Sequence, residues 1–334
     1  MPLAITMGDP AGIGPELLLA AWRDRAPLAL PPFYVLADPD VLSARSSDLG
    51  LSLPISVCAP EEAEQRFADA LPVFALQNRA DTRCGAAAPA SPDAVIEAIA
   101  VAVAHVKEGL ATGIVTAPIA KKSLYAAGFQ FPGHTEFLGS LASRHWPSEP
   151  AVPVMMLAGP DLRTVPVTVH IPVNAIARAW TSERIIEVAR VTERDLRTRF
   201  GIAKPRLVLA GLNPHAGEGG TIGTEDETVS RPAVERLRAE GIDIVGPLPG
   251  DTLFHARARA KYDAALCAYH DQALIPVKTL AFDETVNVTL GLPFVRTSPD
   301  HGTAFDIAGK GVAKPDSLVA AIRLADRLAR GGAH

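Results

Sequence analysis

The sequence of 334 residues has no long apolar run, few cysteines and no block of basic residues. No segment approaches about 18 uninterrupted apolar residues, so we expect no membrane-spanning helix. The start, Met1 to Asp9, lacks the basic region and apolar core of a secretory signal peptide, which favours a cytoplasmic protein. Acidic and basic residues are interspersed at a net charge of −5, a pattern that argues against a nucleic-acid partner but allows small anionic ligands.

The cysteines Cys58, Cys84 and Cys267 are odd in number and have no CxxC spacing. This argues for reduced thiols and against a disulfide framework or a zinc site built from thiolates. Cys267 lies in an expected strand and is expected to pack in the core. The chain also has no internal repeat, low-complexity tract or obvious linker, so at this length we expect two intimately joined domains.

Short apolar segments alternate with amphipathic segments along the whole chain, which predicts an α/β fold with mostly parallel sheets. Strands are expected at residues 3–6, 33–37, 113–116, 152–157, 164–169, 206–210 and 264–268. Helices are expected at residues 15–25, 92–110, 135–144, 181–200, 229–240 and 317–330. The acidic, alanine-rich stretch 59–90 is expected at the surface.

Three histidines, His170, His215 and His270, each follow the end of a short apolar run. Ligands of α/β proteins bind outside the carboxyl ends of the strands, so these imidazoles can converge on one site. Three imidazoles that leave positions open for substrate would form a catalytic metal site. The alternative is that the histidines are unrelated and hydrogen-bonded separately in loops. Asp251 and Asp271 are candidate partners that would orient the histidines.

The segment from Gly8 to Glu16 lies between an expected strand and an expected helix, where a dinucleotide-binding loop would be. Its glycine spacing is not GxGxxG and Pro10 lacks a backbone donor, so a tight turn is favoured over a nucleotide cradle. The polar, glycine-punctuated segment from His301 to Gly311 is instead typical of a flexible binding loop.

Two further groups of residues are candidates for binding an anion. His134 and Thr135 begin an expected helix, where free backbone donors bind phosphate or carboxylate readily, although Thr135 can also act simply as a cap. Lys278, Asn287 and Arg296 follow one another at intervals of about nine residues and form a candidate clamp for a phosphoester.

Several long motifs, in the same order along nearly the whole chain, resemble the 4-hydroxythreonine-4-phosphate dehydrogenase family of vitamin B6 biosynthesis. These motifs are residues 7–16, 133–137, 213–218, 269–276 and the segment from His301. The resemblance implies a homodimer whose site is shared across the interface, with at least one metal ligand from the partner chain. It implies metal ligands at His170, His215 and His270, and substrate contacts at His134, Thr135, Lys278, Asn287 and Arg296.

The family is similar to the isocitrate and isopropylmalate dehydrogenases, whose nicotinamide-binding loop has the pattern seen from His301 to Gly311. The similarity implies two interwoven α/β/α domains with the active site in the cleft. A cofactor-side domain would comprise residues 1–130 and 297–334, and a central domain for metal, substrate and dimerisation residues 131–296. The implied contacts to NAD or NADP are His301, Gly302, Thr303, Ala304 and Asp306.

The resemblance implies NAD-dependent, metal-assisted oxidation of the C3 hydroxyl of 4-phosphohydroxy-L-threonine, followed by decarboxylation to 3-amino-2-oxopropyl phosphate in pyridoxal 5'-phosphate biosynthesis. The divalent ion would be zinc, magnesium or cobalt, and the candidate catalytic groups are Lys278, Asp251 and Asp271. One alternative is a dehydrogenase of 4-phospho-D-threonate or 4-phospho-D-erythronate, which the same residues would serve. Two others are a phosphate acyltransferase of similar architecture and a non-catalytic metal- or metabolite-binding protein.

Overall fold

The computed structural model describes residues 1–85, 91–126, 128–131, 133–149 and 151–331. Contacts within the chain divide it into two compact units. The first unit is formed by Met1–Pro153 and Leu292–Ala329, and the second by Val154–Gly291. The predicted domains, residues 1–130 with 297–334 and residues 131–296, stay predictions.

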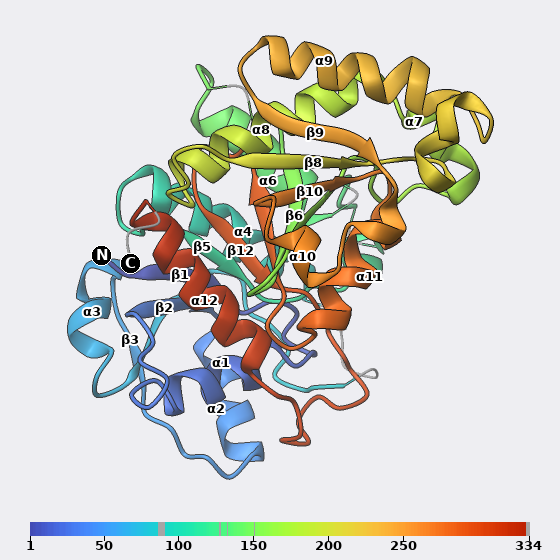
Figure 1. Cartoon of the computed structure of the whole chain (residues 1–334). Coiled ribbons are helices and arrows are strands. Elements are labelled where there is room, and N and C mark those ends of the chain that lie inside the picture. Colours follow the sequence, from blue (N-terminus) through green and yellow to red (C-terminus); the bar gives the residue numbers. More distant parts are fainter. Residues whose placement is uncertain (86–90, 127, 132, 150, 332–334) are drawn as a thin grey trace. The chain divides into compact units, whose positions relative to one another are not determined.

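The first unit contains a parallel sheet with the strand order β3, β4, β2, β1, β5 and β12, of which all strands but β4 are labelled in Figure 1. Its strands are β1 (Leu3–Thr6), β2 (Phe33–Ala37), β3 (Ile55–Val57), β4 (Leu71–Ala75), β5 (Ile114–Thr116) and β12 (Arg296–Pro299). Its helices are α1 (Gly14–Arg23), α2 (Pro39–Asp48), η1 (Pro60–Glu62), α3 (Ala63–Arg66), α4 (Pro92–Lys107), α5 (Lys121–Ala126), α6 (His134–His145) and α12 (Asp316–Ala329).

The central strands of this sheet are apolar because helices cover them. All residues of β1 and β2 are buried, which is typical of parallel strands that are covered on both faces. Helix α4 packs against β1, β2 and β5, and α12 packs against β12, β5 and β1. In Figure 1, α12 crosses in front of β1. The polar residues at the ends of these strands are therefore held on a rigid base.

The second unit has the strand order β11, β6, β7, β10, β8 and β9. The pairs from β7 to β9 are parallel, whereas β6 is antiparallel to both β11 and β7. Its strands are β6 (Val154–Ala158), β7 (Arg163–Pro166), β8 (Arg206–Ala210), β9 (Asp243–Leu248), β10 (Ala264–Cys267) and β11 (Val286–Leu290). Its helices are η2 (Val173–Ala175), α7 (Ile176–Ala179), α8 (Ser182–Thr198), η3 (Pro214–Gly220), η4 (Asp226–Ser230), α9 (Arg231–Ala239), η5 (Gly250–Thr252), α10 (Ala256–Arg259) and α11 (His270–Leu280).

A core of the second unit is formed by side chains of β6, β8, β10 and α11, among them Leu157, Val208 and Val277. Cys267 is fully buried in this core, and burial raises the pKa of its thiol. The predicted α/β class with mostly parallel sheets is confirmed, as is the packing of Cys267. No helix in the described ranges is long and apolar enough to cross a membrane.

Each expected strand and helix is found near its expected bounds, but several elements were not expected. The strands β3, β4, β9, β11 and β12 are additions, and so are the helices α2 and α11. The prediction that residues 59–90 lie at the surface is wrong for β4, where Leu71 and Val73 are fully buried. The reason is that β4 pairs with both β2 and β3, so it lies within the sheet.

Candidate functional site

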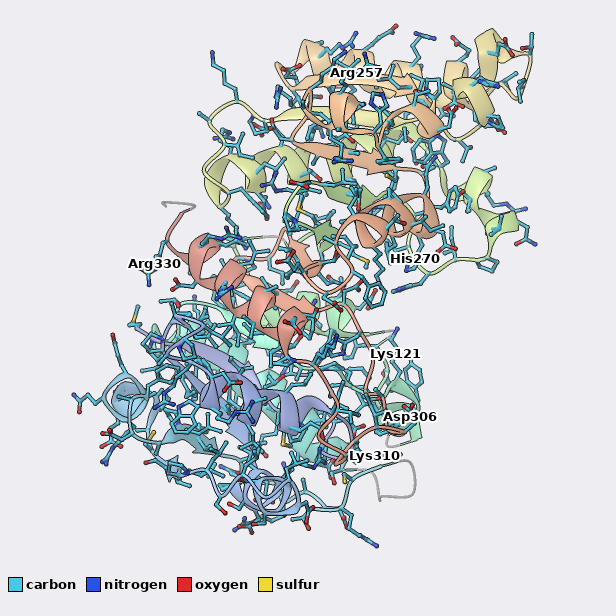
Figure 2. The ribbon with its side chains drawn as sticks, turned by 60° about the horizontal axis from the view of Figure 1, so that its bottom comes forward. Lys121, Arg257, His270, Asp306, Lys310 and Arg330 are labelled. Atoms are coloured by element: carbon cyan, nitrogen blue, oxygen red, sulfur yellow. The ribbon has the colours of Figure 1, made fainter. Side chains whose placement is uncertain are left out.

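Two of the histidines predicted to bind a metal lie together in the second unit. The ring centroids of His170 and His270 are 5.5 Å apart. His170 follows β7, and its backbone is left-handed with a φ of 53°. His270 is the first residue of α11 and is labelled in Figure 2. A left-handed residue other than glycine is uncommon, and such strained residues cluster at functional sites.

The carboxylate of Asp271 orients the ring of His270. Asp271 Oδ1 lies 2.7 Å from His270 Nδ1. A carboxylate on one ring nitrogen fixes the tautomer and leaves the other nitrogen, Nε2, for a metal. Asp251 lies exposed in η5, and the roles predicted for Asp251 and Asp271 in catalysis stay predictions.

His215 lies on a loop whose backbone is left-handed over several consecutive residues. From His215 to Gly219 the φ angles are 53°, 52°, 78°, 43° and 66°. His215 is exposed. Across the residues that the structure describes, no group of three or more His, Cys, Asp and Glu side chains is arranged to hold a metal ion. The three imidazoles therefore do not converge within one chain, and only His170 and His270 are brought together.

A buried carboxylate that the sequence analysis did not single out holds the loop of His215. Asp226 is 0% exposed, and its Oδ1 and Oδ2 accept hydrogen bonds from the backbone N–H groups of Leu212 and Asn213, each at 2.9 Å. The hydroxyl of Ser230 donates a further bond to Oδ1 at 3.1 Å. Asp226 begins the π-helix η4, and such segments are frequent at functional sites. It therefore fixes the backbone just before His215.

Lys278 and Asn287 are the predicted substrate contacts of the second unit. Lys278 lies on α11, slightly more than two turns after His270. Its Nζ is 5.5 Å from the ring centroid of Phe282. Asn287 is half-buried on β11, where it pairs with Leu157 of β6. Their contact with a substrate stays a prediction.

Arg296, a predicted substrate contact of the first unit, is buried at the start of β12. It is 3% exposed, and its Nε and Nη2 donate to Thr116 Oγ1 at 3.2 and 2.6 Å. Burial lowers the pKa of its guanidinium to about 10, so the group is still charged at neutral pH. A buried arginine of this kind can bind a planar anion through several fixed donors.

His134 begins α6 beside two cations. Burial, together with the positive charges of Arg296 and Lys121, holds the pKa of His134 well below its ordinary value. Its Nε2 is enclosed and has no hydrogen-bond partner among the described residues. The ring is thus neutral in a positive field next to the amide groups of a helix start, where an anion is favoured. Thr135 follows it and is half-buried.

Lys121 was not singled out from the sequence. It is exposed at the start of α5 and is labelled in Figure 2. A Cβ atom at Gly133 would lie 3.4 Å from its Nζ, so the ammonium group reaches the start of α6. The signal that could have found it is its position shortly after the strand β5, the same kind of position that identified the histidines.

The segment from Gly8 to Glu16 uses its backbone donors within the protein. Ala11 N–H donates to Asp9 Oδ1 and Gly12 N–H to the carbonyl of Asp9, each at 3.0 Å. A Cβ atom at Gly14 would lie only 2.4 Å from the carbonyl oxygen of Met7. This is the geometry of the tight turn that the sequence favoured, with few donors left to hold a phosphate.

The segment from His301 to Gly311 offers several groups to a ligand. His301 Nδ1 contacts the carbonyl of Gly302 at 3.0 Å, while its Nε2 is enclosed without a partner in the described part of the chain. Gly302 and Asp306 are exposed, and Asp306 is labelled in Figure 2 beside Lys310. A Cβ atom at Gly302 would meet nothing within 4 Å. The exposed carboxylate of Asp306 is the kind of group that binds the ribose hydroxyls of a cofactor.

Most of the chain matches the model of one known protein family. Residues 29–325 match the family described as pyridoxal phosphate biosynthetic protein PdxA. The chain belongs to this family. The match confirms the predicted family and a role in pyridoxal phosphate biosynthesis. It does not by itself assign the metal or the nicotinamide cofactor.

Relatives in the PdxA family are named as dehydrogenases. The chain is 59% identical over 335 residues to a 4-hydroxythreonine-4-phosphate dehydrogenase of Methylorubrum populi, covering 100% of this chain and 96% of that protein. A crystal structure of 4-hydroxythreonine-4-phosphate dehydrogenase from Klebsiella pneumoniae has a TM-score of 0.86 and 37% identity, covering 98% and 99% of the two chains. The predicted enzyme class, an oxidoreductase acting on a CH–OH group, is confirmed.

The acyltransferase alternative is supported at the level of the fold alone. A branched-chain phosphotransacylase from Enterococcus faecalis has a TM-score of 0.57 and 12% identity, covering 98% of this chain and 99% of that one. At 12% identity the two proteins share a fold, and a shared fold does not imply a shared function.

Proposed function

We propose that this member of the PdxA family is a 4-hydroxythreonine-4-phosphate dehydrogenase. The reaction is oxidation of the C3 hydroxyl of 4-phosphohydroxy-L-threonine by NAD or NADP, followed by decarboxylation to 3-amino-2-oxopropyl phosphate. The observation that carries this proposal is the arrangement at the start of α6, where His134 Nε2 is enclosed without a partner among the described residues and lies in the field of the cations Arg296 and Lys121. A neutral imidazole can donate or accept a hydrogen bond while the cations attract a phosphorylated acid.

Both units contain residues that we propose as substrate contacts. In the first unit, Arg296 supplies charge-assisted hydrogen bonds to an anionic group, and His134 and Thr135 place the start of α6 against it. In the second unit, Lys278 and Asn287 are the proposed contacts, one cationic and one neutral. Binding of the phosphate far from the reacting carbon would orient the carbinol for hydride transfer.

The residues near His170 fit a divalent cation. His270 has Nδ1 engaged by Asp271, and its ring lies beside that of His170. Imidazole ligands suit zinc and cobalt, whereas magnesium prefers oxygen ligands. A divalent cation bound here would supply Lewis-acid stabilisation of negative charge on the C3 oxygen. The hydrogen bond to Asp271 orients the ring of His270. The left-handed backbone of His170 sets the direction in which its side chain leaves the chain.

A second copy of the chain is the proposed source of the third imidazole, His215. Large apolar side chains are exposed on the segments that carry the other two histidines: Val173 is 80% exposed, Ile275 63% and Phe282 69%. Exposed apolar groups of this kind mark protein–protein contacts. A homodimer that covers them would explain why the described residues of one chain do not form a complete metal site.

The proposed cofactor contacts are His301, Gly302, Thr303, Ala304 and Asp306, and the nicotinamide cofactor supplies the hydride acceptor. The exposed carboxylate of Asp306 is the group suited to ribose hydroxyls. A cytoplasmic location stays a prediction.

Steady-state kinetics with three substrates test the proposed function. Phosphohydroxythreonine is expected to give a higher kcat/KM for NADH production than phosphothreonate or phosphoerythronate, because a dedicated enzyme would recognise its amino group at C2, where the other two substrates carry a hydroxyl. A higher value for either of the other substrates would assign the chain to the alternative dehydrogenases. Acyl-phosphate formation from acyl-CoA without NADH production would refute the dehydrogenase assignment.

A further inference from the structure

A buried ion pair in the first unit connects helices α1 and α2. Arg45 of α2 is 0% exposed and Glu16 of α1 is 4% exposed, and their Nη1 and Oε2 atoms are 3.4 Å apart. Removing two charges from water costs free energy that their attraction alone does not always offset. A buried ion pair therefore needs further hydrogen bonds, and the groups that form them with Arg45 and Glu16 are the groups that the pair holds in place.

The guanidinium of Arg45 binds the turn formed by residues 8–14. Its Nη1 donates to the carbonyl of Gly12 at 2.9 Å, and its Nη2 donates to the carbonyl of Pro10 at 3.0 Å. The donors of a guanidinium lie in one plane at fixed directions, so these bonds fix the spacing of the two carbonyls. Arg45 is thus the side chain that sets the shape of the turn.

The carboxylate of Glu16 binds the segment proposed to hold the cofactor. Gly309 N–H donates to Glu16 Oε2 at 2.6 Å, a short, charge-assisted bond. A second contact ties the same two segments, because Ile13 N–H donates to the carbonyl of Thr303 at 2.9 Å. A Cβ atom at Gly12 would lie 2.9 Å from the Thr303 oxygen, so this approach needs glycine. The cofactor segment is therefore held at both ends, at Thr303 and at Gly309.

A third segment, which contains Cys84 and Gly85, contacts both the turn of residues 8–14 and the cofactor segment. We call these three segments together the frame. Gly85 N–H donates to the carbonyl of Ala11 at 2.8 Å, and Cys84 Sγ lies 3.7 Å from the carbonyl of Ala308. Gly309 has a φ of 76°, and a Cβ atom there would lie 2.5 Å from Cys84 Sγ, so glycine is required at this contact. The segments around Ala11, Cys84 and Ala308 are thus packed backbone to backbone.

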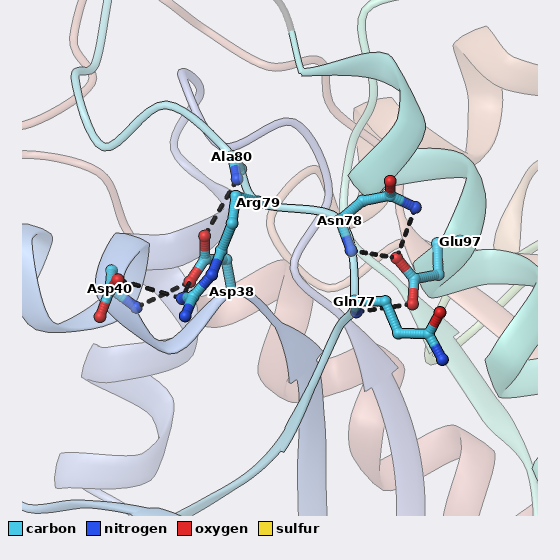
Figure 3. Close-up of polar contacts among 7 residues, drawn as sticks. All are labelled: Asp38, Asp40, Gln77, Asn78, Arg79, Ala80 and Glu97. Carbon is cyan, nitrogen blue, oxygen red and sulfur yellow. Dashed lines mark hydrogen bonds and ion pairs between the residues drawn. The ribbon is translucent and has the colours of Figure 1, made fainter.

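The third segment is itself fixed by two carboxylates, as Figure 3 shows. Asp38 accepts hydrogen bonds from Arg79 Nη1 at 2.8 Å and from the N–H of Ala80 at 3.0 Å. Glu97 accepts the N–H groups of Gln77 and Asn78, each at 2.8 Å. These bonds hold the backbone of residues 77–80, a few residues before Cys84.

We propose that Glu16 and Arg45 are positioning residues for the dinucleotide cofactor. They hold the arch from Thr303 to Gly309, on which Asp306 is exposed, in the conformation that binds the cofactor. The turn of residues 8–14 then serves cofactor binding indirectly, as the base of the arch. This inference rests on the proposed assignment of the cofactor to the segment from His301 to Gly311.

Dinucleotide binding by the purified full chain tests this role. NADH and NADPH affinities are measured by fluorescence titration, together with the affinity for a phosphorylated substrate analogue. Glu16→Gln keeps the shape of the side chain and removes its charge, and it is expected to weaken binding of the preferred dinucleotide about tenfold. The affinity for the substrate analogue is expected to change by less than about twofold.

Two variants of Arg45 provide a second measurement. Arg45→Met removes every donor to the turn, whereas Arg45→Lys keeps the charge and one donor to a carbonyl. Arg45→Met is expected to raise the KM for the dinucleotide at least as much as Glu16→Gln, and Arg45→Lys is expected to recover part of the loss. No recovery in a folded Arg45→Lys protein, with Glu16→Gln also unchanged in affinity, would overturn the proposal.

Tyr34→Phe is the matched structural control. It removes a buried hydrogen bond of 2.9 Å between Tyr34 Oη and His105 Nδ1, which joins β2 to α4 in the same unit. It is expected to lower Tm without changing dinucleotide affinity. If Glu16→Gln lowers Tm in the same way and leaves dinucleotide affinity unchanged, the pair is structural and the proposal is wrong.

Asp306→Ala separates this inference from the proposed function. If Asp306→Ala weakens dinucleotide binding and Glu16→Gln does not, the cofactor segment is correctly assigned and the positioning role is refuted. If both variants bind the dinucleotide like the wild type, the cofactor segment itself is wrongly assigned. Weaker dinucleotide binding in both variants, with analogue affinity retained, supports the two proposals together.

Discussion

Replacing Asp226 with asparagine tests whether one carboxylate holds the loop of His215. Asp226 is 0% exposed, and each of its oxygens accepts one backbone N–H, from Leu212 and from Asn213, at 2.9 Å. An asparagine side chain offers one acceptor and one donor group, so one of these N–H groups would face an NH2 group. Losing one bond to a charged group in this setting costs about 1.5–3 kcal/mol, and we expect the free energy of unfolding to fall by that amount.

Urea unfolding of the metal-free protein measures this loss, and calorimetric titration with zinc measures its effect on metal affinity. Zinc affinity is expected to fall because the backbone before His215 loses its fixed position. Glu225→Gln is the control on the same loop: it keeps an acceptor for Asn213 Nδ2, 2.9 Å away, and is expected to change stability by less than about 0.5 kcal/mol. If Asp226→Asn unfolds within about 0.5 kcal/mol of the wild type and binds zinc equally well, the reasoning is refuted.

Three further results are expected. His270→Ala is expected to abolish retention of a divalent ion. Asp271→Asn is expected to weaken metal affinity about tenfold to a hundredfold, the usual loss when a carboxylate that orients a histidine ligand is removed. Unchanged metal content in dialysed His270→Ala would contradict the metal assignment. Arg296→Met is expected to weaken binding of a phosphorylated substrate analogue about tenfold to a hundredfold. Lys121→Met is expected to weaken it less, because the side chain of Lys121 is exposed. If Arg296→Met binds the analogue as tightly as the wild type, another group binds the phosphate. Burial lowers the pKa of His105, so below about pH 6.5 the unfolded chain binds more protons than the folded chain, and stability decreases as the pH falls. His105→Gln is therefore expected to flatten the fall in Tm from about pH 7 to pH 5, and an unchanged slope would exclude this contribution.

The strands that the sequence predicted are those that consist mainly of consecutive apolar residues. β1, β2 and β8 match their expected bounds, because central parallel strands are apolar throughout. β3 was missed because none of its residues, Ile55–Val57, is fully buried. β12 was missed because it is not apolar: it consists of Arg296, Thr297, Ser298 and Pro299. These polar residues are buried by the pairing of β12 with β5 and by α12, which the local sequence does not encode.

Helix α11 shows how tertiary packing overrides a local signal. Pro276 lies inside the helix, where a proline lacks an N–H group and normally ends or bends a helix, and no helix was expected at these residues. The helix forms because Ala273 and Val277 on either side of Pro276 pack into the core of the second unit. Its existence changes the context of Lys278, which lies on a helix and not among turns and strands.

The sequence indicated reactive groups by their chemical type, and it indicated Asp271 as a partner of His270, but it did not indicate the buried carboxylates that hold the neighbouring loops. His170 and His270 were singled out because imidazoles after apolar runs suggest a metal, and the structure brings their rings together. Glu16 and Asp226 were not, because a buried carboxylate is recognised only by its partners. The partner of Glu16 is Gly309, 293 residues away in the sequence, and no local pattern connects them.

Both carboxylates nevertheless share a feature that the sequence contains. Glu16 follows Gly14 by two residues, and Asp226 follows Gly223 by three, so each acid lies in the first turn of a helical segment next to a glycine-bearing turn. An acid at a helix start would ordinarily accept the N–H groups of its own helix. Here each carboxylate accepts the N–H groups of another segment, and each of those segments carries residues proposed to bind a ligand. Stability and ligand binding are therefore coupled at both positions, and a substitution that lowers one is expected to lower the other.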